Sequence, residues 1–322
     1  MQSTDVITFG EAMAMFIADS VGPLQGGRKF TLELAGAETN VAIGLARLGF
    51  NTSFVSRVGA DAFGKFIIQS LQKHGVQTEQ IITDNNYPTG FQLKSMVEIG
   101  DPEVQYFRKG SAASHLNLLD CKEEYFKQAK HLHMTGIPLA LSESCKLFAQ
   151  KAMDFFKSQN KKISFDPNLR PTLWKSNREM IDTINFYASQ ANYVLPGLEE
   201  GIQLTGYKTP QDIASFYLDT GNVELVIVKL GEQGAYFKTT SEDGIIGGYE
   251  VDKVVDTVGA GDGFAVGVIS GILENLSIKE SIQRGNAIGA LAVQSYGDNT
   301  GYPDKQTLVS YINNQSQRSV SI

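Results

Sequence analysis

Short runs of apolar residues alternate along the chain with segments in which apolar residues recur at helical spacing. The run at 6–10 ends in a glycine, and Val41, Leu45 and Leu48 then repeat through a predicted helix at 40–48. Further strands are predicted at 52–58, 132–134, 163–165, 193–195 and 225–230. Further helices are predicted at 61–74, 142–158, 178–190, 210–219, 260–274 and 278–293. This alternation predicts an α/β fold with a mostly parallel sheet covered on both faces, which binds ligands at the carboxyl ends of its strands.

Two segments depart from this rhythm. Residues 88–109 hold two runs of alternating polarity on either side of a turn sequence at 100–102, which predicts a hairpin. Residues 12–34 are expected to place more extended chain beside it. We therefore expect a small β-sheet lid on a single domain that spans 1–322, because no repeat or linker divides the chain.

Charge and composition narrow the classes of partner. The chain has 28 Lys and Arg against 35 Asp and Glu, a net charge of −7, so it is a poor candidate for nucleic-acid binding. No stretch approaches the roughly 20 apolar residues that span a bilayer. The N-terminus lacks the basic region of a secretory signal, and two cysteines are too few for a disulfide framework. These features predict a cytoplasmic protein that binds neither membranes nor nucleic acids.

The strongest chemical signal is the segment 256–264, Asp-Thr-Val-Gly-Ala-Gly-Asp-Gly-Phe. Gly259, Ala260 and Gly261 open a predicted helix, where free backbone N–H groups and the positive end of the helix dipole form an anion site. Asp262 lies inside it, and a carboxylate among N–H donors is expected to stay ionised and to accept a proton from a hydroxyl. Phosphoryl transfer needs both features. Taken alone, the segment also fits an ordinary glycine-rich helix start capped by aspartate.

The context favours the chemical interpretation. From 256 to 269 the chain resembles the second signature of the PfkB (ribokinase-like) sugar kinases, and their first signature is present as Ala-Gly-Ala-Glu-Thr-Asn-Val-Ala at 35–42. The two segments lie in the family's order, and the resemblance covers essentially the whole chain. It implies a three-layer α/β/α sandwich with a β-lid, ATP as phosphoryl donor, Asp262 as catalytic base and Gly259 to Asp262 as the anion hole.

The resemblance also assigns the nucleotide site. The loop that begins at Lys229 and contains Gly231 and Gly234 lies along the nucleotide in similar kinases, although a plain strand–turn–strand hairpin has the same pattern. Asn286 lies in a helix of small residues that resembles the wall of the adenine pocket.

The metal positions also come from the resemblance. Glu199 is expected to organise water around Mg²⁺, although Pro196 replaces the Asn with which the family usually begins this motif. Asp256 and the Val258 carbonyl occupy positions that hold a monovalent cation, such as K⁺, in similar kinases. The sequence leaves open whether this second site is used.

The residue types around the acceptor indicate an acid. Tyr106 and Arg108 are two apart on a predicted lid strand and share a face, and Arg170 follows the predicted strand at 163–165. Two arginines at one site predict a carboxylate on the substrate, because a guanidinium group matches carboxylate geometry. Gly36 would let the substrate approach the backbone closely, and Asn40 of the first signature is expected to contact it.

Within the family, the segments around Arg108 and Arg170 resemble those of the 2-keto-3-deoxygluconate kinases. Met15 stands where ribokinases and fructokinases usually have an Asp that grips sugar hydroxyls, which suits a substrate lacking one hydroxyl. Gln92 stands where similar ketodeoxygluconate kinases often have Tyr, and fructokinases share much of the segment around Arg170.

The resemblance therefore implies an ATP- and Mg²⁺-dependent kinase that phosphorylates the 6-hydroxyl of 2-keto-3-deoxygluconate. A fructokinase or another sugar kinase of the same fold is the alternative, and a non-catalytic sugar or nucleotide sensor is a second. A homodimer or higher homo-oligomer is expected, because lids with exposed apolar residues often pair between subunits.

Overall fold

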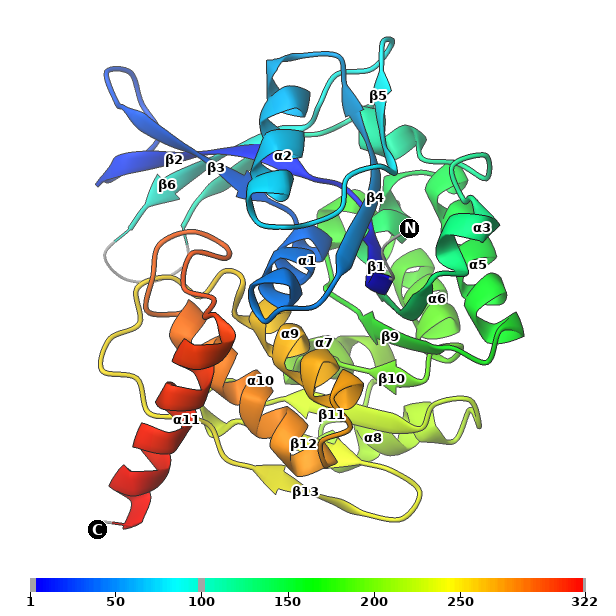
Figure 1. The fold of residues 1–322 in the computed structure, drawn as a ribbon, viewed down its shortest axis with the longest axis vertical. Coiled ribbons are helices and arrows are strands. Elements are labelled where there is room, and N and C mark those ends of the chain that lie inside the picture. Colours follow the sequence, from blue (N-terminus) through cyan, green and yellow to red (C-terminus); the bar gives the residue numbers. More distant parts are fainter. Residues whose placement is uncertain (1–3, 98–101, 321–322) are drawn as a thin grey trace.

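The computed structural model describes residues 4–97 and 102–320, with side chains described as far as 315. A nine-stranded sheet forms its centre, in the order β13-β12-β11-β10-β9-β8-β1-β4-β5 (Figure 1). The strands are β1 (Thr4–Phe9), β4 (Thr52–Gly59), β5 (Ile81–Asp84), β8 (Ala129–Thr135), β9 (Lys162–Asp166), β10 (Tyr193–Val194), β11 (Leu225–Lys229), β12 (Ala235–Lys238) and β13 (Asp243–Ile246). Pairing is parallel from β5 to β11 and antiparallel beyond it, so the prediction of a mostly parallel sheet is confirmed.

Helices cover both faces of this sheet, and strand β11 shows why. Its side chains alternate in direction, so Val226 and Val228 join one apolar cluster while Leu225 and Ile227 join another. The first cluster includes α5 (Glu143–Ser158), α6 (Asn177–Ala188), α7 (Leu198–Thr205) and α8 (Pro210–Leu218). The second includes α1 (Ala37–Arg47), α9 (Ala260–Leu273), α10 (Ile278–Ala292) and α11 (Lys305–Val320). The three-layer α/β/α sandwich is therefore confirmed.

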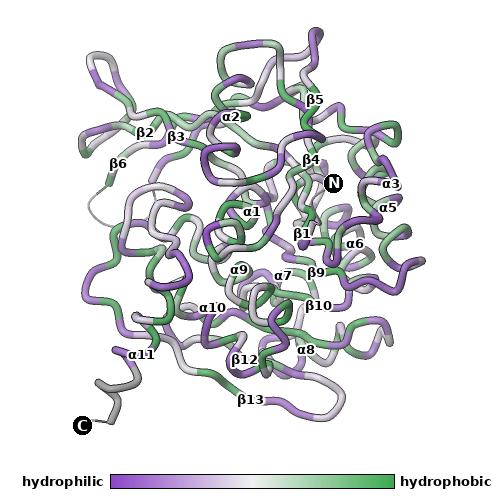
Figure 2. Tube along the Cα trace, in the orientation of Figure 1, coloured by the Kyte–Doolittle hydropathy of each residue, from purple (hydrophilic) through white to green (hydrophobic). Residues whose placement is uncertain are grey.

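Shorter helices complete the chain: α2 (Ala62–Lys73), α3 (Glu123–Phe126), α4 (Ile137–Leu141) and the 3₁₀ turns η1 (Ala112–His115), η2 (Pro171–Leu173) and η3 (Gly231–Gln233). Hydrophobic residues concentrate along the central strands, while hydrophilic residues mark the loop tips (Figure 2). In the described part of the chain, none of the helices has both the length and the hydropathy needed to cross a bilayer.

A second, four-stranded sheet lies over one end of the main sheet, in the order β3-β2-β6-β7. Its strands are β2 (Met13–Val21), β3 (Phe30–Ala35), β6 (Phe91–Met96) and β7 (Val104–Phe107). They come from the two segments that depart from the helix–strand rhythm, and β6 and β7 pair antiparallel as a hairpin should. Of the predicted turn, Gly100 and Asp101 lie outside the described residues. That the whole chain is one domain stays a prediction.

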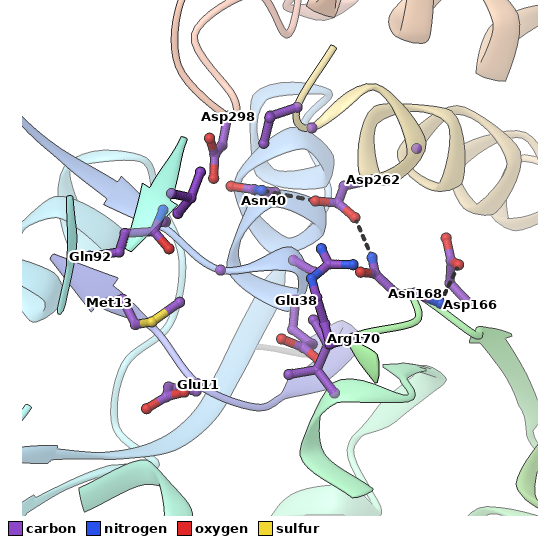
Figure 3. Close-up of a pocket in the computed structure, with 18 of the residues that line it drawn as sticks. Glu11, Met13, Glu38, Asn40, Gln92, Asp166, Asn168, Arg170, Asp262 and Asp298 are labelled. Carbon is purple, nitrogen blue, oxygen red and sulfur yellow. Dashed lines mark hydrogen bonds between the residues drawn. The ribbon is translucent and has the colours of Figure 1, made fainter. Parts of the chain in front are cut away.

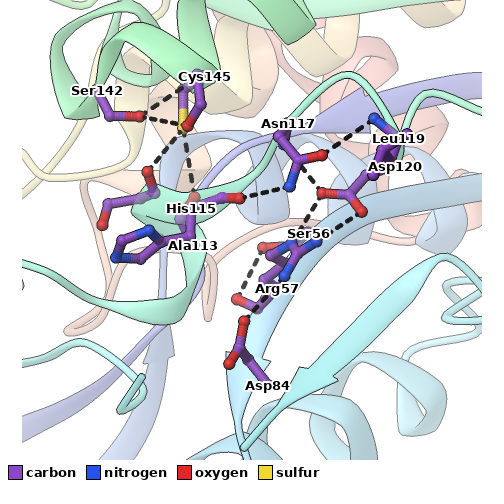
Figure 4. A network of polar contacts seen from close by, with 12 residues as sticks. Ser56, Arg57, Asp84, Ala113, His115, Asn117, Leu119, Asp120, Ser142 and Cys145 are labelled. Carbon is purple, nitrogen blue, oxygen red and sulfur yellow. Dashed lines mark hydrogen bonds and ion pairs between the residues drawn. The ribbon is translucent and has the colours of Figure 1, made fainter. Parts of the chain in front are cut away.

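An arginine in β4 fixes the edge of the main sheet next to the small one (Figure 4). The Arg57 guanidinium lies 2.9 Å from Asp84 of β5 and forms two bonds, of 2.8 and 2.9 Å, to Asp120. Asp120 in turn accepts the backbone N–H of Asn117 at 2.9 Å. Both carboxylates are buried, so this network holds the chain that leaves the small sheet against β4 and β5.

Candidate active site

A cavity of about 320 Å³ lies between the small sheet and the carboxyl ends of the central strands (Figure 3). Its walls come from the start of α1, from β2, β6 and β7, from the loops after β9 and β11, and from the start of α9. The predicted site residues that line it are Gly36, Asn40, Gln92, Tyr106, Arg108, Arg170, Lys229, Gly259, Gly261 and Asp262. The predicted residues that do not line it are Glu199, Gly231, Gly234, Asp256, Ala260 and Asn286.

Asp262 lies at the start of α9 between two side-chain amides. Asn40 of α1 donates to one carboxylate oxygen at 2.9 Å, and Asn168 donates to the other at 3.0 Å. The Asn299 side-chain amide donates to Oδ1 of the Asn40 side chain at 2.9 Å, which fixes the orientation of the Asn40 amide. Sequence reasoning missed Asn168, although it lies only two residues before Arg170 in the same loop.

The pKa of Asp262 is raised from 3.8 to about 7, mainly by burial and also by the negative charge of Asp166. The hydrogen bond from Asn40 and the positive charges of Arg170 and Lys229 act in the opposite direction. Asp262 is therefore ionised only in part near neutral pH, in contrast to the expectation from sequence, because its burial outweighs its hydrogen bonds. A pKa near the working pH suits a general base, which must both accept and release a proton.

The start of α9 is shaped to bind an anion. Gly259 precedes the helix in the left-handed conformation (φ 83°), and a Cβ there would overlap the Asp298 carbonyl oxygen, so only glycine fits. Within the described chain, the N–H groups of Gly261 and Asp262 have no acceptor. A Cβ on Gly261 would lie 3.4 Å from the Lys229 ammonium. The free N–H groups of Gly261 and Asp262 and the Lys229 ammonium thus lie close enough together to bind one anion.

Lys229, at the end of β11, is part of a buried charge cluster. Its ammonium lies 2.6 Å from Asp166 at the end of β9. Burial lowers the pKa of Lys229, but the carboxylates of Asp166, Glu200 and Asp262 raise it overall, so the side chain keeps its positive charge. Burial also raises the pKa of Asp166 to about 6, against the effect of Lys229.

The structure corrects the predicted magnesium residue. Glu199 is exposed and lies outside the cavity, whereas its neighbour Glu200 lines it. The Glu200 carboxylate accepts the backbone N–H of Gly197, which starts α7, and that of Leu169, both at 2.8 Å. Successive helical residues point about 100° apart, so the capping role of Glu200 turns Glu199 to solvent.

The two arginines differ in their surroundings. Arg108 forms bonds of 2.5 and 2.6 Å to the buried Glu11, which also accepts the Ser111 hydroxyl. Among the residues that the structure describes, no carboxylate forms an ion pair with Arg170, whose guanidinium donates to its neighbour's carbonyl. The expectation of two free arginines is therefore corrected to one, because Glu11 neutralises Arg108. Tyr106 lies beside Arg108, with its ring centre 5.6 Å from the guanidinium carbon.

The apolar wall of the cavity is Met13 rather than Met15. Met15 is fully buried, packs with Ile17 and Ala35 and does not line the cavity; its correspondence to a sugar-binding Asp stays a prediction. Gly36 lines the cavity and must be glycine, because a Cβ there would lie 2.6 Å from the Glu11 carbonyl oxygen and φ is 141°. Close approach of the substrate to its backbone stays a prediction.

Glu38 also lines the cavity, and sequence reasoning assigned no role to it. It is buried at the start of α1, and one carboxylate oxygen accepts the Thr135 hydroxyl. Within the described chain, its other oxygen is buried without a partner. Burial raises the pKa of Glu38 to about 7.

Two of the residues predicted to bind the nucleotide, Gly234 and Asn286, contact the loop that follows β13. The Asn286 amide donates to the carbonyls of Ile246 and Gly247 at 3.2 and 2.9 Å, and Gly234 packs against the same loop. Gly231 and Gly234 lie in the turn of an antiparallel hairpin between β11 and β12, with φ of 62° and 93°. The structure thus contains the hairpin that was the alternative interpretation, and nucleotide contact by these residues stays a prediction.

Asp256, the predicted ligand of a monovalent cation, has a protein partner instead. Its carboxylate lies 2.6 Å from the ammonium of Lys94 in β6. The oxygen that would coordinate an ion therefore already binds a positive charge.

Comparison with known proteins identifies the family of the chain. Residues 3–305 match the pfkB family carbohydrate kinases. The chain is 52% identical, over 98% of its length and 97% of the relative's, to 2-dehydro-3-deoxygluconokinase of Bacillus subtilis. It is 31% identical to a probable fructokinase-5 of Arabidopsis thaliana, over 91% and 92% of the two chains.

Solved structures agree on the fold. A PfkB protein from Polaromonas sp. JS666 superposes with a TM-score of 0.89 at 46% identity, over 96% of this chain and 100% of that one. An E. coli protein described as a candidate ribokinase II, solved with ATP and Mg²⁺, has a TM-score of 0.88 at 27% identity, over 97% and 99%. A fructokinase variant from Vibrio cholerae, solved with fructose, ADP and potassium, has a TM-score of 0.86 at 28% identity, over 97% and 99%.

The buried Asp262 predicts a pH-dependent gain in stability for Asp262→Asn. The pKa of Asp262 is raised from 3.8 to about 7 in the folded protein, so the folded state disfavours the ionised carboxylate. Wild-type stability therefore falls as pH rises from about 4 to about 7. Each pKa unit corresponds to about 1.4 kcal/mol. Asp262→Asn should therefore gain in melting temperature relative to wild type as pH rises from about 4 to about 7, and the difference should level off above that.

Thermal unfolding at several pH values tests this prediction, because any pH-independent cost of the substitution cancels in the difference. Asp252→Asn, at an exposed position four residues before Asp256, is the control and should show no trend. A difference between Asp262→Asn and wild type that stays constant with pH would contradict the raised pKa.

Proposed function

The chain belongs to the pfkB family of carbohydrate kinases, and from this premise we propose that it is an ATP-dependent 2-keto-3-deoxygluconate (2-dehydro-3-deoxygluconate) kinase. The observation that carries the proposal is the position of Arg170 in the same cavity as Asp262, with no carboxylate of the described chain paired to it. A cation that is free beside a catalytic base selects an acceptor with a negative charge. The 52% identity to the Bacillus subtilis enzyme supports the same acceptor.

In the proposed reaction, the 6-hydroxyl oxygen of the acceptor attacks the γ-phosphorus of ATP. The bond from that phosphorus to the β–γ bridging oxygen breaks, ADP leaves, and the hydroxyl proton passes to Asp262. Asn40 and Asn168 hold the carboxylate in place. The N–H groups at the start of α9 and the Lys229 ammonium stabilise charge on the transferred group.

The cavity fits a magnesium ion that arrives with the nucleotide. Within residues 4–97 and 102–320, no group of three His, Cys, Asp or Glu side chains could hold a metal alone. Mg²⁺ usually keeps several waters and binds through one or two carboxylates and substrate phosphates. We propose that Glu200 and Asp166 face its water shell, since both line the cavity and both already accept N–H groups. When bound, the ion would neutralise charge on the phosphates.

Arg170 and Tyr106 are proposed to hold the acid end of the acceptor, with Gln92, Asn40 and Gly36 around its hydroxyl groups. Arg108 contributes geometry rather than free charge, because Glu11 neutralises it. A fructokinase is the alternative, and it explains the site less well, since fructose offers no carboxylate to Arg170.

We further propose a cytoplasmic homo-oligomer. The small sheet carries exposed large hydrophobic side chains, namely Val21, Phe30, Leu32, Tyr106 and Phe107. Such patches often mark contacts between protein chains. Both cysteines are buried and unpaired, as in proteins of a reducing compartment. Light scattering after size-exclusion chromatography should give at least the mass of a dimer, and a mass of 35.1 kDa would contradict this proposal.

The first kinetic prediction concerns Asp262. Asp262→Asn should keep ATP binding and lower kcat by about 10²–10⁴, the usual contribution of a general base. In wild type, kcat/KM should fall below a pH of about 7, where Asp262 becomes protonated. Asn40→Ala removes a hydrogen bond that lowers this pKa, so the fall should begin at higher pH.

A coupled ADP-release assay across pH measures these effects. Asn222→Ala, at an exposed position, is the control and should leave the profile unchanged. Near-normal turnover of Asp262→Asn would show that another group accepts the proton.

The second kinetic prediction concerns the acceptor. Arg170→Leu should lower kcat/KM for ketodeoxygluconate by roughly 10- to 150-fold, the value of a charge-assisted hydrogen bond of about 1.5–3 kcal/mol. The KM for ATP should stay the same, and any weak activity on fructose should change less. Arg178→Leu, an exposed arginine of α6, is the matched control.

Equal losses on ketodeoxygluconate and fructose would favour the fructokinase alternative. Arg108→Leu is the less informative variant, because it leaves Glu11 buried without its partner and should destabilise the protein.

A further inference from the structure

Lys94 is a buried cation that joins three separate parts of the chain. It lies on β6 of the small sheet and is 2% exposed. Its ammonium lies 2.6 Å from Asp256, in the loop before α9, and 3.3 Å from Asp298, in the loop after α10. Both carboxylates are also buried, so one positive charge serves two negative ones away from solvent.

The two loops that Lys94 joins are the ones that shape the anion site. The second Asp256 oxygen accepts the backbone N–H of Val258 at 3.1 Å, one residue before Gly259. The backbone carbonyl of Asp298 packs directly on Gly259, and the next residue, Asn299, orients Asn40. Figure 3 shows Asp298 close to Asn40, on the side of the cavity opposite Asp166.

We infer that the Lys94 ammonium is the built-in monovalent cation of this protein and makes it independent of K⁺. The sequence resemblance placed a cation on Asp256, and the structure places the Lys94 charge there instead. An ammonium group has the same charge as K⁺, and it donates up to three hydrogen bonds. The V. cholerae fructokinase variant was solved with potassium bound, so a related chain does bind this ion.

The space around Lys94 supports this inference. The cavity between Lys94, Asp256 and Tyr296 has a volume of about 10 Å³, which holds at most one water molecule. A hydrated cation therefore has no room on this side of the ammonium, whereas the side toward Asp298 borders the catalytic cavity. Removal of the charge alone would leave two buried carboxylates to repel one another beneath the anion site, so Lys94 acts as a positioning residue for Gly259 and Asn40.

Two variants separate the charge of Lys94 from its volume. Lys94→Ala removes both and leaves space for an ion between Asp256 and Asp298, whereas Lys94→Met removes the charge and fills the space. Lys253→Met, at an exposed position in the same loop as Asp256, is the matched control. Each protein is melted and assayed in KCl, NH₄Cl and choline chloride at equal ionic strength, because choline is too large for the site.

Wild type and Lys253→Met should melt at the same temperature in all three salts, and their kcat should agree within about twofold, as for charges that are only screened by salt. Lys94→Ala should melt lower in choline and lose about 100-fold in kcat, since a buried ion pair has been broken. K⁺ or NH₄⁺ should raise its melting temperature and recover about tenfold of that kcat, and Lys94→Met should show no such recovery.

Two results would overturn the inference. One is a wild-type enzyme that loses activity or melts lower when choline replaces K⁺. The other is a Lys94→Ala variant as stable and active in choline as wild type. The salt dependence of wild type decides the matter even where Lys94→Ala does not fold. The kcat measurements rest on the proposed function, but the melting temperatures do not. If the protein phosphorylated none of the sugars, the proposed function would be wrong, and the melting temperatures would still test the role of Lys94.

Discussion

The burial of negative charge at one point is the constraint on which this structure depends. Asp262, Glu38 and Asp166 are all buried around one cavity, and burial raises each of their pKa values into the range of about 6 to 7. A fold holds such groups only where hydrogen bonds and opposite charges compensate the loss of water. The α/β sandwich provides the hydrogen-bonding and ion-pair partners of all three, which are Asn40, Asn168, Thr135 and Lys229. The small sheet contributes Lys94, which pairs with Asp256 and Asp298 in two nearby loops, so buried ion pairs join the two sheets.

The parts of the site that sequence reasoning could find are local. The Gly-rich start of α9 is visible because the helix start, its glycines and Asp262 are neighbours in the chain, and the strand–helix rhythm is visible because each period is short. The partners of these residues are distant. Asn40 lies 222 residues from Asp262, and Lys94 lies 162 residues from Asp256. The hydrophobic periodicity of a sequence carries no information on such distant pairs. The pairing of Arg108 with Glu11 and of Lys94 with Asp256 and Asp298 could therefore be found only in the structure.

Errors of one or two positions have a different origin. Glu199 and Glu200 are equally good carboxylates in the sequence, and only the capping of α7 decides which one faces the cavity. Met13 and Met15 have the same direction on an ideal strand, yet of the two only Met13 borders the cavity, because Met15 is buried in a cluster with Ile17 and Ala35. Such choices follow from where an element begins and how far it extends, which the pattern of apolar residues fixes only loosely.

The distribution of Lys and Arg side chains around the cavity bears on how the proposed site would bind two different anions, the phosphoryl group and the carboxylate of the acceptor. Lys229 is held by Asp166, Arg108 by Glu11, and Lys94 by Asp256 and Asp298. These pairs fix geometry, but each carries little net charge toward a ligand. In the proposed function, the backbone N–H groups at the start of α9 therefore supply most of the positive potential at the phosphoryl group, together with the Lys229 ammonium. In the described part of the chain, Arg170 is the cavity-lining Arg or Lys without an ion pair, so the proposal gives the selection of a charged acceptor to this one residue.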